Sequence, residues 1–234
     1  MYEIVTDFER PDPALIERAR ANYFCLAGCR VGPRFVMDPG IKPLDREWRI
    51  CGPAFTVRPE HTQDMLMSQL AGKYVKPGDI VVIDAGGESR MAVFGASMSA
   101  GVKSSGAAGV VIDGYTLTAE VIRARENIPV FCRGTLSVAG QGKLPGWLNT
   151  PVICGGVIVN PGDLILGDED GVVVIPKAQI EEVIAGVESN ARPRPLDGNI
   201  AARKPAAVPY FRSSGAEEKV DKLAADPNSK VRII

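Results

Sequence analysis

The sequence predicts an α/β fold, and three features of residues 75–114 carry that prediction. Residues 80–83 (IVVI) and 110–112 (VVI) are short, β-branched apolar runs that each end at an aspartate, as buried strands do. Residues 96–105, between them, are mostly small and are bounded by glycines, as suits a helix packed closely on a sheet. This strand–loop–helix–strand order favours neighbouring parallel strands joined by a right-handed crossover. Ligands of such sheets gather at the carboxyl ends of the strands.

The residues before this unit predict two helices and a strand pair. Asp12 and Pro13 begin a predicted helix over residues 14–28, whose apolar residues recur at helical spacing. Three prolines make residues 32–44 a predicted loop. Residues 48–50 and 54–57 predict a pair of strands on either side of Gly52 and Pro53, and residues 64–72 predict a second helix.

The residues after the unit continue the α/β pattern. Thr118 is a predicted cap for a helix over residues 119–125, and residues 129–132 predict a strand. The pattern Val-x-Pro-Gly-Asp at residues 75–79 recurs at residues 159–163 before another apolar run. Convergent turn chemistry and duplication explain this repeat equally well. An Asp-Gly turn at residues 170–171, between apolar runs, predicts a β-hairpin.

The composition changes towards the C-terminus. Prolines interrupt the sequence from residue 193 to residue 209, and a polar segment follows. We expect one domain over residues 1–185 and a Pro-rich extension over residues 186–234. The extension contains a predicted short helix over residues 216–225 and packs on the body or on a neighbouring subunit, with Tyr210 and Phe211 as its anchor.

The overall charge argues against a nucleic-acid partner. The chain of 234 residues is 45% apolar, has a formal net charge of −1 and contains no basic run, whereas phosphate binding needs clustered lysine and arginine. No run of 18 apolar residues is present, and the N-terminus lacks the layout of a signal peptide. We therefore expect a soluble, cytoplasmic protein without a membrane partner.

The cysteines and the histidine do not form a recognisable reactive motif. The sequence has an odd number of scattered cysteines, which predicts reduced and mostly buried thiols rather than a zinc site: Cys25, Cys29, Cys51, Cys132 and Cys154. The single histidine, His61, lies in a polar turn with no nucleophile motif beside it. A Ser-His-Asp or Cys-His triad is therefore not predicted.

Six short segments together resemble the RraA-like family, which includes the regulator of ribonuclease activity and the aldolases of 4-hydroxy-4-methyl-2-oxoglutarate and 4-carboxy-4-hydroxy-2-oxoadipate. The segments are residues 40–44, 52–57, 77–87, 106–114, 129–135 and 161–172. The resemblance implies a swivelling β/β/α sandwich with a central mixed sheet. It also implies assembly as a trimer or a dimer of trimers, with sites between subunits.

For the family's aldolases, the resemblance implies three site features. They are an acid-bearing loop at a helix start, an arginine that grips a pyruvyl carboxylate, and an adjacent aspartate that holds a divalent metal ion. Here the loop begins at Gly95 and has Ala96 in place of the acid, while Leu117 and Thr118 replace the arginine and the aspartate. The Mg²⁺ that the family implies thus lacks its ligand, and we predict no metal-binding residue.

The main chain of the loop remains a predicted anion site, because amides at a helix start favour negative charge. The predicted catalytic residues are Ser97, Arg133 and Glu88. The predicted substrate-binding residues are Gly95, Ala96, Ser97, Met98, Lys42, Arg90, Asp113, Tyr115, Leu117 and Thr118. Ordinary surface or interface charge is the alternative for the three cations, Lys42, Arg90 and Arg133. Asp84 is either a replacement acid or a strand cap, and the acids at residues 168–170 are interpreted as turn residues.

The function that follows is a lyase of the aldolase or decarboxylase type, acting on a small oxo- or hydroxy-carboxylate with an altered site that need not hold a metal. The alternative is a non-catalytic oligomeric binding protein of the ribonuclease-regulator type. A conventional metal-dependent aldolase ranks third, because residues 117 and 118 stand against it.

Overall fold

The computed structural model describes residues 2–22, 24–88, 90–124 and 128–189, together with Glu218, Asp221, Lys222 and Ala225. The side chains of residues 24–26 and 88 lie outside this description. The chain divides into two compact units, Met1–Arg194 and Pro195–Ile234. The four described residues of the second unit are helical, within the helix expected over residues 216–225, whereas Tyr210 and Phe211 lie outside the described residues. The domain boundary at residue 186 and the packing of the extension stay predictions.

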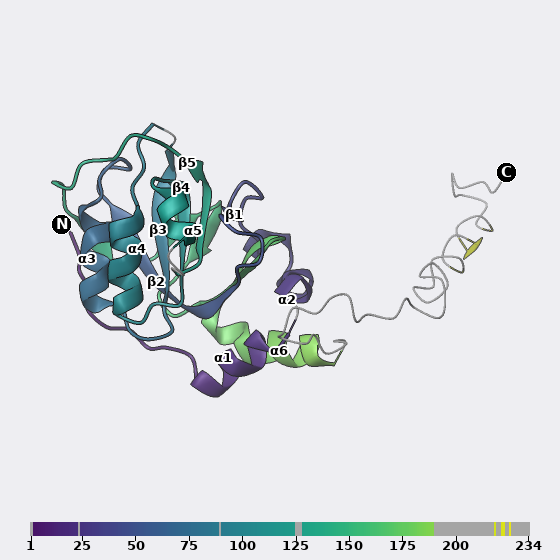
Figure 1. Ribbon diagram of the computed structural model, residues 1–234. Coiled ribbons are helices and arrows are strands. Elements are labelled where there is room, and N and C mark those ends of the chain that lie inside the picture. The colour runs from purple at the N-terminus through teal and green to yellow at the C-terminus, as the bar shows by residue number, and fades with distance from the viewer. Residues whose placement is uncertain are drawn as a thin grey trace. The chain divides into compact units, whose positions relative to one another are not determined.

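The first unit is built on a mixed sheet in the order β1-β5-β4-β3-β2-β9-β10, with β6 paired to β2 (Figure 1). Strands β2 to β5 are parallel, the other pairings are antiparallel, and β7 and β8 form a separate hairpin. The mixed α/β fold predicted from the sequence is thereby confirmed. The strands are β1 Lys42–Pro43, β2 Ile50–Pro59, β3 Ile80–Glu88, β4 Gly109–Thr116, β5 Val130–Thr135, β6 Gly146–Leu148, β7 Val152–Cys154, β8 Val157–Val159, β9 Leu164–Asp168 and β10 Gly171–Ile175.

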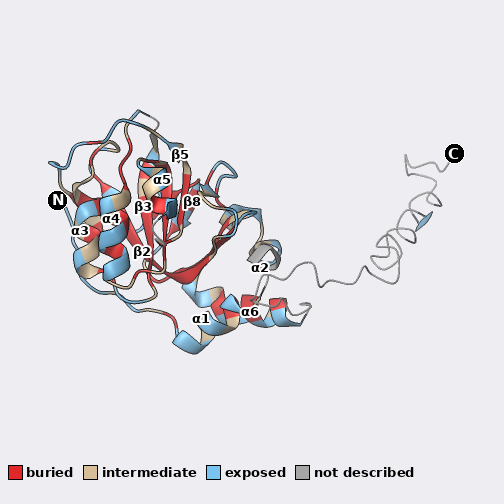
Figure 2. Cartoon of the chain, in the orientation of Figure 1, coloured by how far each residue is buried: buried red, intermediate tan, exposed pale blue. Residues whose placement is uncertain are grey.

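Helices and the hairpin cover opposite faces of this sheet. Alternate strand residues such as Val81 and Ile83 pack with α3 and α4, and the intervening residues such as Val82 pack with β7 and β8. A third core lies where α1, α2 and α6 meet β9 and β10. Figure 2 shows the sheet as almost entirely buried between exposed helix surfaces. The helices are α1 Pro13–Arg20, α2 Phe24–Val31, α3 Leu66–Tyr74, α4 Ala96–Ser104, α5 Ala119–Ala124 and α6 Ile180–Glu188, with short 3₁₀ turns at Pro33–Phe35 and Lys177–Gln179.

The predicted strand–helix–strand unit is present as β3, α4 and β4, with β3 and β4 parallel. The first strand does not end at Asp84 as expected. Gly86 and Gly87 have φ of 58° and 71°, which glycine adopts without strain, and β3 continues through an irregularity to Glu88. The glycines therefore bend the strand instead of stopping it.

The predicted strand pair around Gly52 and Pro53 is one continuous strand, β2. Its first half pairs with β9, and its second half, from Ala54, pairs with β3. A Cβ at Gly52 would lie 2.1 Å from the carbonyl oxygen of Gly78. Glycine is needed there because another backbone crosses the strand closely, which the sequence alone presents as a turn.

The predicted helix over residues 14–28 is also divided, into α1 and α2. Asp12 caps α1 as expected, and its carboxylate accepts a hydrogen bond from the Ala14 N–H at 2.8 Å. The helix ends because Asn22 turns back on it: the Asn22 side-chain amide donates to the Arg18 carbonyl at 2.8 Å. This competition between side chain and backbone is typical of asparagine.

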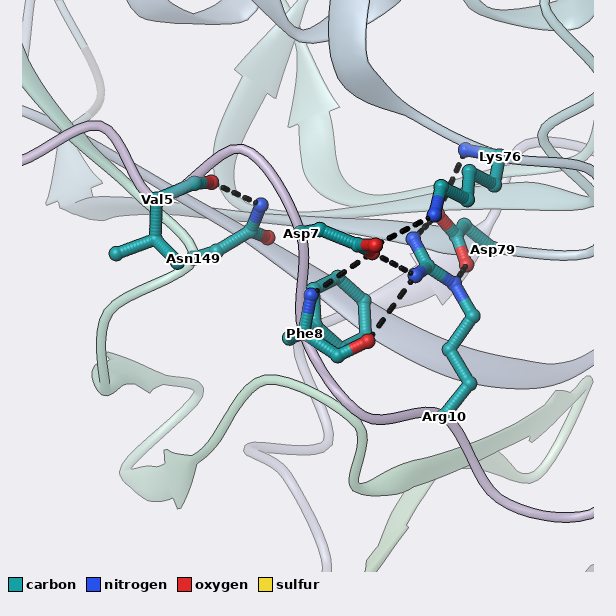
Figure 3. A network of polar contacts seen from close by, with 7 residues as sticks. All are labelled: Val5, Asp7, Phe8, Arg10, Lys76, Asp79 and Asn149. Carbon is teal, nitrogen blue, oxygen red and sulfur yellow. Dashed lines mark hydrogen bonds and ion pairs between the residues drawn. The ribbon is translucent and has the colours of Figure 1, made fainter.

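The N-terminal segment is fastened along the first unit by a polar network (Figure 3). Arg10 donates to both carboxylate oxygens of Asp79, with Nε–Oδ1 and Nη2–Oδ2 distances of 2.7 Å, and the Asp79 side chain is fully buried. The Arg10 guanidinium also lies 3.9 Å above the Phe8 ring. Further along, the Asn149 side-chain amide donates to the Val5 carbonyl at 2.7 Å.

Several smaller expectations are confirmed. Strands β9 and β10 form the predicted hairpin. Four of the cysteines are free thiols, and burial raises the pKa of Cys51 to about 12 and that of Cys132 to about 11, which leaves these thiols unreactive. The side chain of Cys25 lies outside the described residues. Among the described residues, no helix has the length and apolar content needed to cross a membrane.

Candidate functional site

A cleft of about 420 Å³ lies at the start of α4 and along its contact with α3, which lies beside α4 in Figure 1. We call it the α4 cleft. Six of the predicted substrate-binding residues line it, among them Ser97, which is also a predicted catalytic residue. The lining consists of Met65, Gln69, Gly72, Gly95, Ala96, Ser97, Met98, Gly101, Val102, Leu117, Thr118 and Ala139.

Backbone amides are the main polar groups that α4 brings to the cleft. Gly95 precedes the helix in an extended conformation, and its carbonyl accepts the first helical hydrogen bond, from Ser99 N at 2.9 Å. The N–H groups of residues 96–98 therefore have no partner within the helix. The Ala96 N–H is used by Thr118, whose Oγ1 lies 2.9 Å away. The amides of Ser97 and Met98 are left for an anion.

The family resemblance implies that Leu117 and Thr118 stand in place of the aldolases' arginine and aspartate. The Leu117 side chain packs on the helix start, because a Cβ at Gly95 would lie 2.9 Å from its Cδ2. Thr118 has a φ of 56°, and its hydroxyl also donates to the Leu117 carbonyl at 2.6 Å. Its oxygen is thus already engaged on the main chain.

The divalent metal ion that the family implies does not fit this site. Leucine offers no donor atom, and a hard cation prefers anionic oxygen ligands to a hydroxyl that already makes two hydrogen bonds. Within the described part of the chain, no three acids, histidines or cysteines are grouped to hold a metal ion. The acids of the β9–β10 turn, residues 168–170, do not form such a group either. The Asp168 carboxylate instead accepts a hydrogen bond from Asp170 N at 3.0 Å, as a turn residue does.

The structure does not bring the predicted cations into the lining of the cleft. Arg133 donates through Nε to Asp113 at 2.5 Å, and its Nη1 lies 3.2 Å from Asp38. The other carboxylate oxygen of Asp113 accepts a hydrogen bond from Gly155 N at 2.8 Å. These residues therefore lie on the hairpin side of the sheet, opposite to α4. Lys42 donates to the carbonyls of residues 169 and 170 at 3.2 and 2.8 Å.

The other predicted site residues are placed as follows. Tyr115 is half-buried and packs on Gly134, where a Cβ would lie 2.8 Å from its ring. Arg90 is exposed, and the side chain of Glu88 lies outside the described residues. Asp84 is half-buried beside the β7–β8 hairpin, and its carboxylate accepts hydrogen bonds from Gly86 N and Ile153 N.

Sequence reasoning missed the contribution of α3 to the cleft. Met65 and Gln69 are four residues apart and so lie on one side of that helix. The four-residue spacing of Met65 and Gln69 can be read from the sequence, but the sequence does not indicate that this side of α3 packs against α4. The two helices meet at Gly72 and Gly101, since a Cβ placed at Gly72 would lie in ordinary van der Waals contact, 3.6 Å, with the Gly101 carbonyl carbon.

Comparisons with known proteins agree with this architecture. Residues 27–174 match the model of the RraA-like family, described as Aldolase/RraA. The chain is 40% identical over 167 residues to a protein of Halalkalibacterium halodurans named "Putative 4-hydroxy-4-methyl-2-oxoglutarate aldolase", a match that covers 69% of this chain and 79% of that protein.

Two solved structures show the same fold. One is RraAS2 of Streptomyces coelicolor, called an unusual member of the RNase ES inhibitor RraA protein family, with a TM-score of 0.70 and 29% identity over 79% of this chain and 95% of that one. The other is the RNA-processing inhibitor RraA of Thermus thermophilis, with a TM-score of 0.55 and 25% identity over 60% of this chain and 84% of that one.

Proposed function

Because this chain belongs to the RraA-like family, we propose that it is a lyase that decarboxylates a small oxo-carboxylate in the α4 cleft without a metal ion. The aldolase name of the 40% identical relative supports a small oxo-acid as the ligand. The observation that carries the proposal is the pair of amides at Ser97 and Met98, which have no helical partner and face a cleft of about 420 Å³.

The neutral lining favours decarboxylation over aldol cleavage. Loss of CO₂ from a 3-oxo acid breaks the bond between C2 and the carboxylate carbon and moves the electron pair to the ketone oxygen, after which water protonates C2 of the enolate. This step needs stabilisation of the enolate oxygen, which the amides and the Ser97 hydroxyl supply. Aldol cleavage also needs a base for the hydroxyl proton, and the lining contains no carboxylate, imidazole or amine.

The test is to assay oxaloacetate decarboxylation and pyruvyl-aldol cleavage, each with added Mg²⁺ and with a chelator. We expect decarboxylation that the chelator does not reduce, and no aldol cleavage. Ser97→Ala is expected to lower the decarboxylation rate by at least about tenfold, whereas Ser104→Ala, at the other end of the same helix and outside the cleft lining, leaves it unchanged. Turnover that requires Mg²⁺ would contradict the proposal.

A non-catalytic regulator is the second candidate, and the engagement of Thr118 with Ala96 favours it, because this contact uses one of the cleft's amides. The Streptomyces relative is described as belonging to an RNase ES inhibitor family. This candidate predicts that the chain inhibits RNase ES in a purified cleavage assay while showing no turnover of any oxo acid. Decarboxylation without inhibition would exclude it.

Both candidates include assembly as a homotrimer or a dimer of trimers, as the family resemblance implies. We propose that residues 186–234 pack on the body or on a neighbouring subunit in that assembly. Light scattering and thermal melts of the full chain and of a chain ending at residue 189, which keeps all of α6, test both points. A monomeric full chain would contradict the assembly, and an unchanged number of subunits and melting temperature after truncation would contradict the role of the extension.

A further inference from the structure

Four charged residues form a row across the parallel strands at their carboxyl ends. Val57, Ile83, Ile112 and Cys132 are paired in register across β2, β3, β4 and β5. The next residue of each strand points to the opposite face, towards the β7–β8 hairpin. Those four residues are Arg58, Asp84, Asp113 and Arg133.

One half of this row is internally neutralised. Asp113 pairs with Arg133 and accepts the Gly155 N–H, and Arg133 also contacts Asp38 at 3.2 Å. Every charge in this half therefore has a partner of the opposite sign. The Arg133–Asp113 pair is a structural contact that fixes the hairpin on the sheet.

The other half is not neutralised. Asp84 accepts long hydrogen bonds from Gly86 N at 3.1 Å and Ile153 N at 3.3 Å, and among the described ion pairs none includes Asp84 or Arg58. Arg58 instead lies over the Trp147 ring, 4.5 Å from its centre. Burial raises the pKa of Asp84 and the charge of the neighbouring Asp113 adds to this effect, whereas the hydrogen bonds from Ile153 N and Gly86 N and the charge of Arg58 lower it. An ammonium group beside Asp84 would relieve that cost.

Arg58 and Asp84 line the same cleft, of about 500 Å³, which we call the hairpin cleft. Its third charged residue, Glu60, accepts a hydrogen bond from Tyr2, which raises the pKa of Tyr2. With two acids and one arginine, the lining has an excess of negative charge, which favours a ligand that carries a cation.

The remaining wall of the hairpin cleft is apolar. Ile153 and Ile158 are directly opposite each other on β7 and β8, and they are 57% and 63% exposed. A cross-strand pair of exposed isoleucines beside charged groups offers a surface for an apolar side chain.

We propose that the hairpin cleft binds a small amino carboxylate with an apolar side chain. Its ammonium group pairs with Asp84, its carboxylate takes the guanidinium of Arg58, and its side chain covers Ile153 and Ile158. Each group of this ligand class matches one feature of the cleft: an aspartate and an arginine that make no ion pair within the described part of the chain, and an exposed apolar pair. The site is separate from the α4 cleft, which lies across the sheet.

The probes are L-leucine, 4-methyl-2-oxopentanoate, which lacks the ammonium group, and isopentylamine, which lacks the carboxylate. Calorimetric titration of the full chain is expected to show millimolar or tighter binding of L-leucine. Each analogue is expected to bind at least about tenfold more weakly, because each loses a charge-assisted contact. Equal binding of L-leucine and the oxo acid, or no binding of L-leucine at millimolar concentration, would overturn the proposal.

Two variants and two controls locate the site. Asp84→Asn and Arg58→Gln are each expected to weaken L-leucine binding by at least about tenfold. Arg34→Gln is a matched control, since Arg34 is likewise exposed and stacked on a ring, that of Phe35 at 4.7 Å, and it should leave binding unchanged. Ser97→Ala should also leave it unchanged. Binding that survives Asp84→Asn in a folded variant would overturn the proposal.

Discussion

The side-chain hydroxyl of Thr118 accepts a hydrogen bond from the backbone N–H of Ala96, with 2.9 Å between Oγ1 and N. A residue at the end of β4 thus caps a helix that begins 22 positions earlier in the chain. At this position, the family resemblance implies an acid that holds a metal ion in the aldolases. The same backbone framework therefore supports a capping contact here, and the start of α4 is stabilised without a charged residue.

Thr118→Val tests this capping contact. Valine keeps the shape and the β-branching of threonine but cannot accept the Ala96 N–H, so the variant is expected to lose about 1 kcal/mol of unfolding free energy. Thr118→Ser keeps the hydroxyl and should lose clearly less. Urea denaturation measures both values. Equal losses for the two variants would show that the methyl group, and not the hydrogen bond, stabilises the helix start.

Substitution of residues 96, 117 and 118 by acids and an arginine tests whether these three positions alone prevent the site from binding a metal ion. The triple variant Ala96→Asp, Leu117→Arg and Thr118→Asp is expected to bind Mg²⁺, because it regains anionic oxygen ligands for a hard cation. The parent chain is expected to show no Mg²⁺ binding in the same calorimetric titration. Binding by the parent, or none by a folded triple variant, would mean that other residues control the metal.

Arg10→Met tests the contact that fastens the N-terminal segment. It leaves the fully buried carboxylate of Asp79 without its cation, and we expect a loss of about 3 kcal/mol, the low end for a broken buried pair, because Arg10 keeps 19% side-chain exposure. Lys76→Met removes the exposed pair with Asp7 and should leave stability nearly unchanged. Denaturant unfolding gives both results, and similar losses would contradict the importance of burial.

The pH dependence of Asp168 provides a further test. Burial raises the pKa of this carboxyl, Asp170 and Glu169 add to the effect, and Lys42 opposes it. A raised folded-state pKa means that ionised Asp168 destabilises the fold at neutral pH, and that this cost disappears as the pH falls through the folded-state pKa. Asp168→Asn keeps an oxygen for the Asp170 N–H and should be more stable than the parent at neutral pH.

The difference in melting temperature between Asp168→Asn and the parent is expected to close as the pH is lowered through the titration range of Asp168. Thermal melts over a pH series measure it. A difference that stays constant with pH would indicate that the substitution acts through packing instead of charge.

The sequence predicted the elements whose signals are local. The runs at residues 80–83 and 110–112, the small-residue helix between them and the hairpin at residues 170–171 were identified because apolar periodicity and turn chemistry depend on neighbours in the chain. The break of the helix predicted over residues 14–28 into α1 and α2 was missed, because it depends on the hydrogen bond from the Asn22 side chain to the Arg18 carbonyl. The continuity of β2 was missed, because Gly52 and Pro53 resemble a turn until a second backbone is seen to cross them.

The same division applies to the site. The sequence by itself determined which residues stand at the start of α4: Ala96, Leu117 and Thr118, where the family resemblance implies an acid, an arginine and a metal ligand. Only the tertiary structure decided which groups share a space: it placed Gln69 of α3 in the α4 cleft, and Arg133 with Asp113 beneath the hairpin on the other face. Strand register and helix packing fix these placements, and both depend on contacts between residues far apart in the chain.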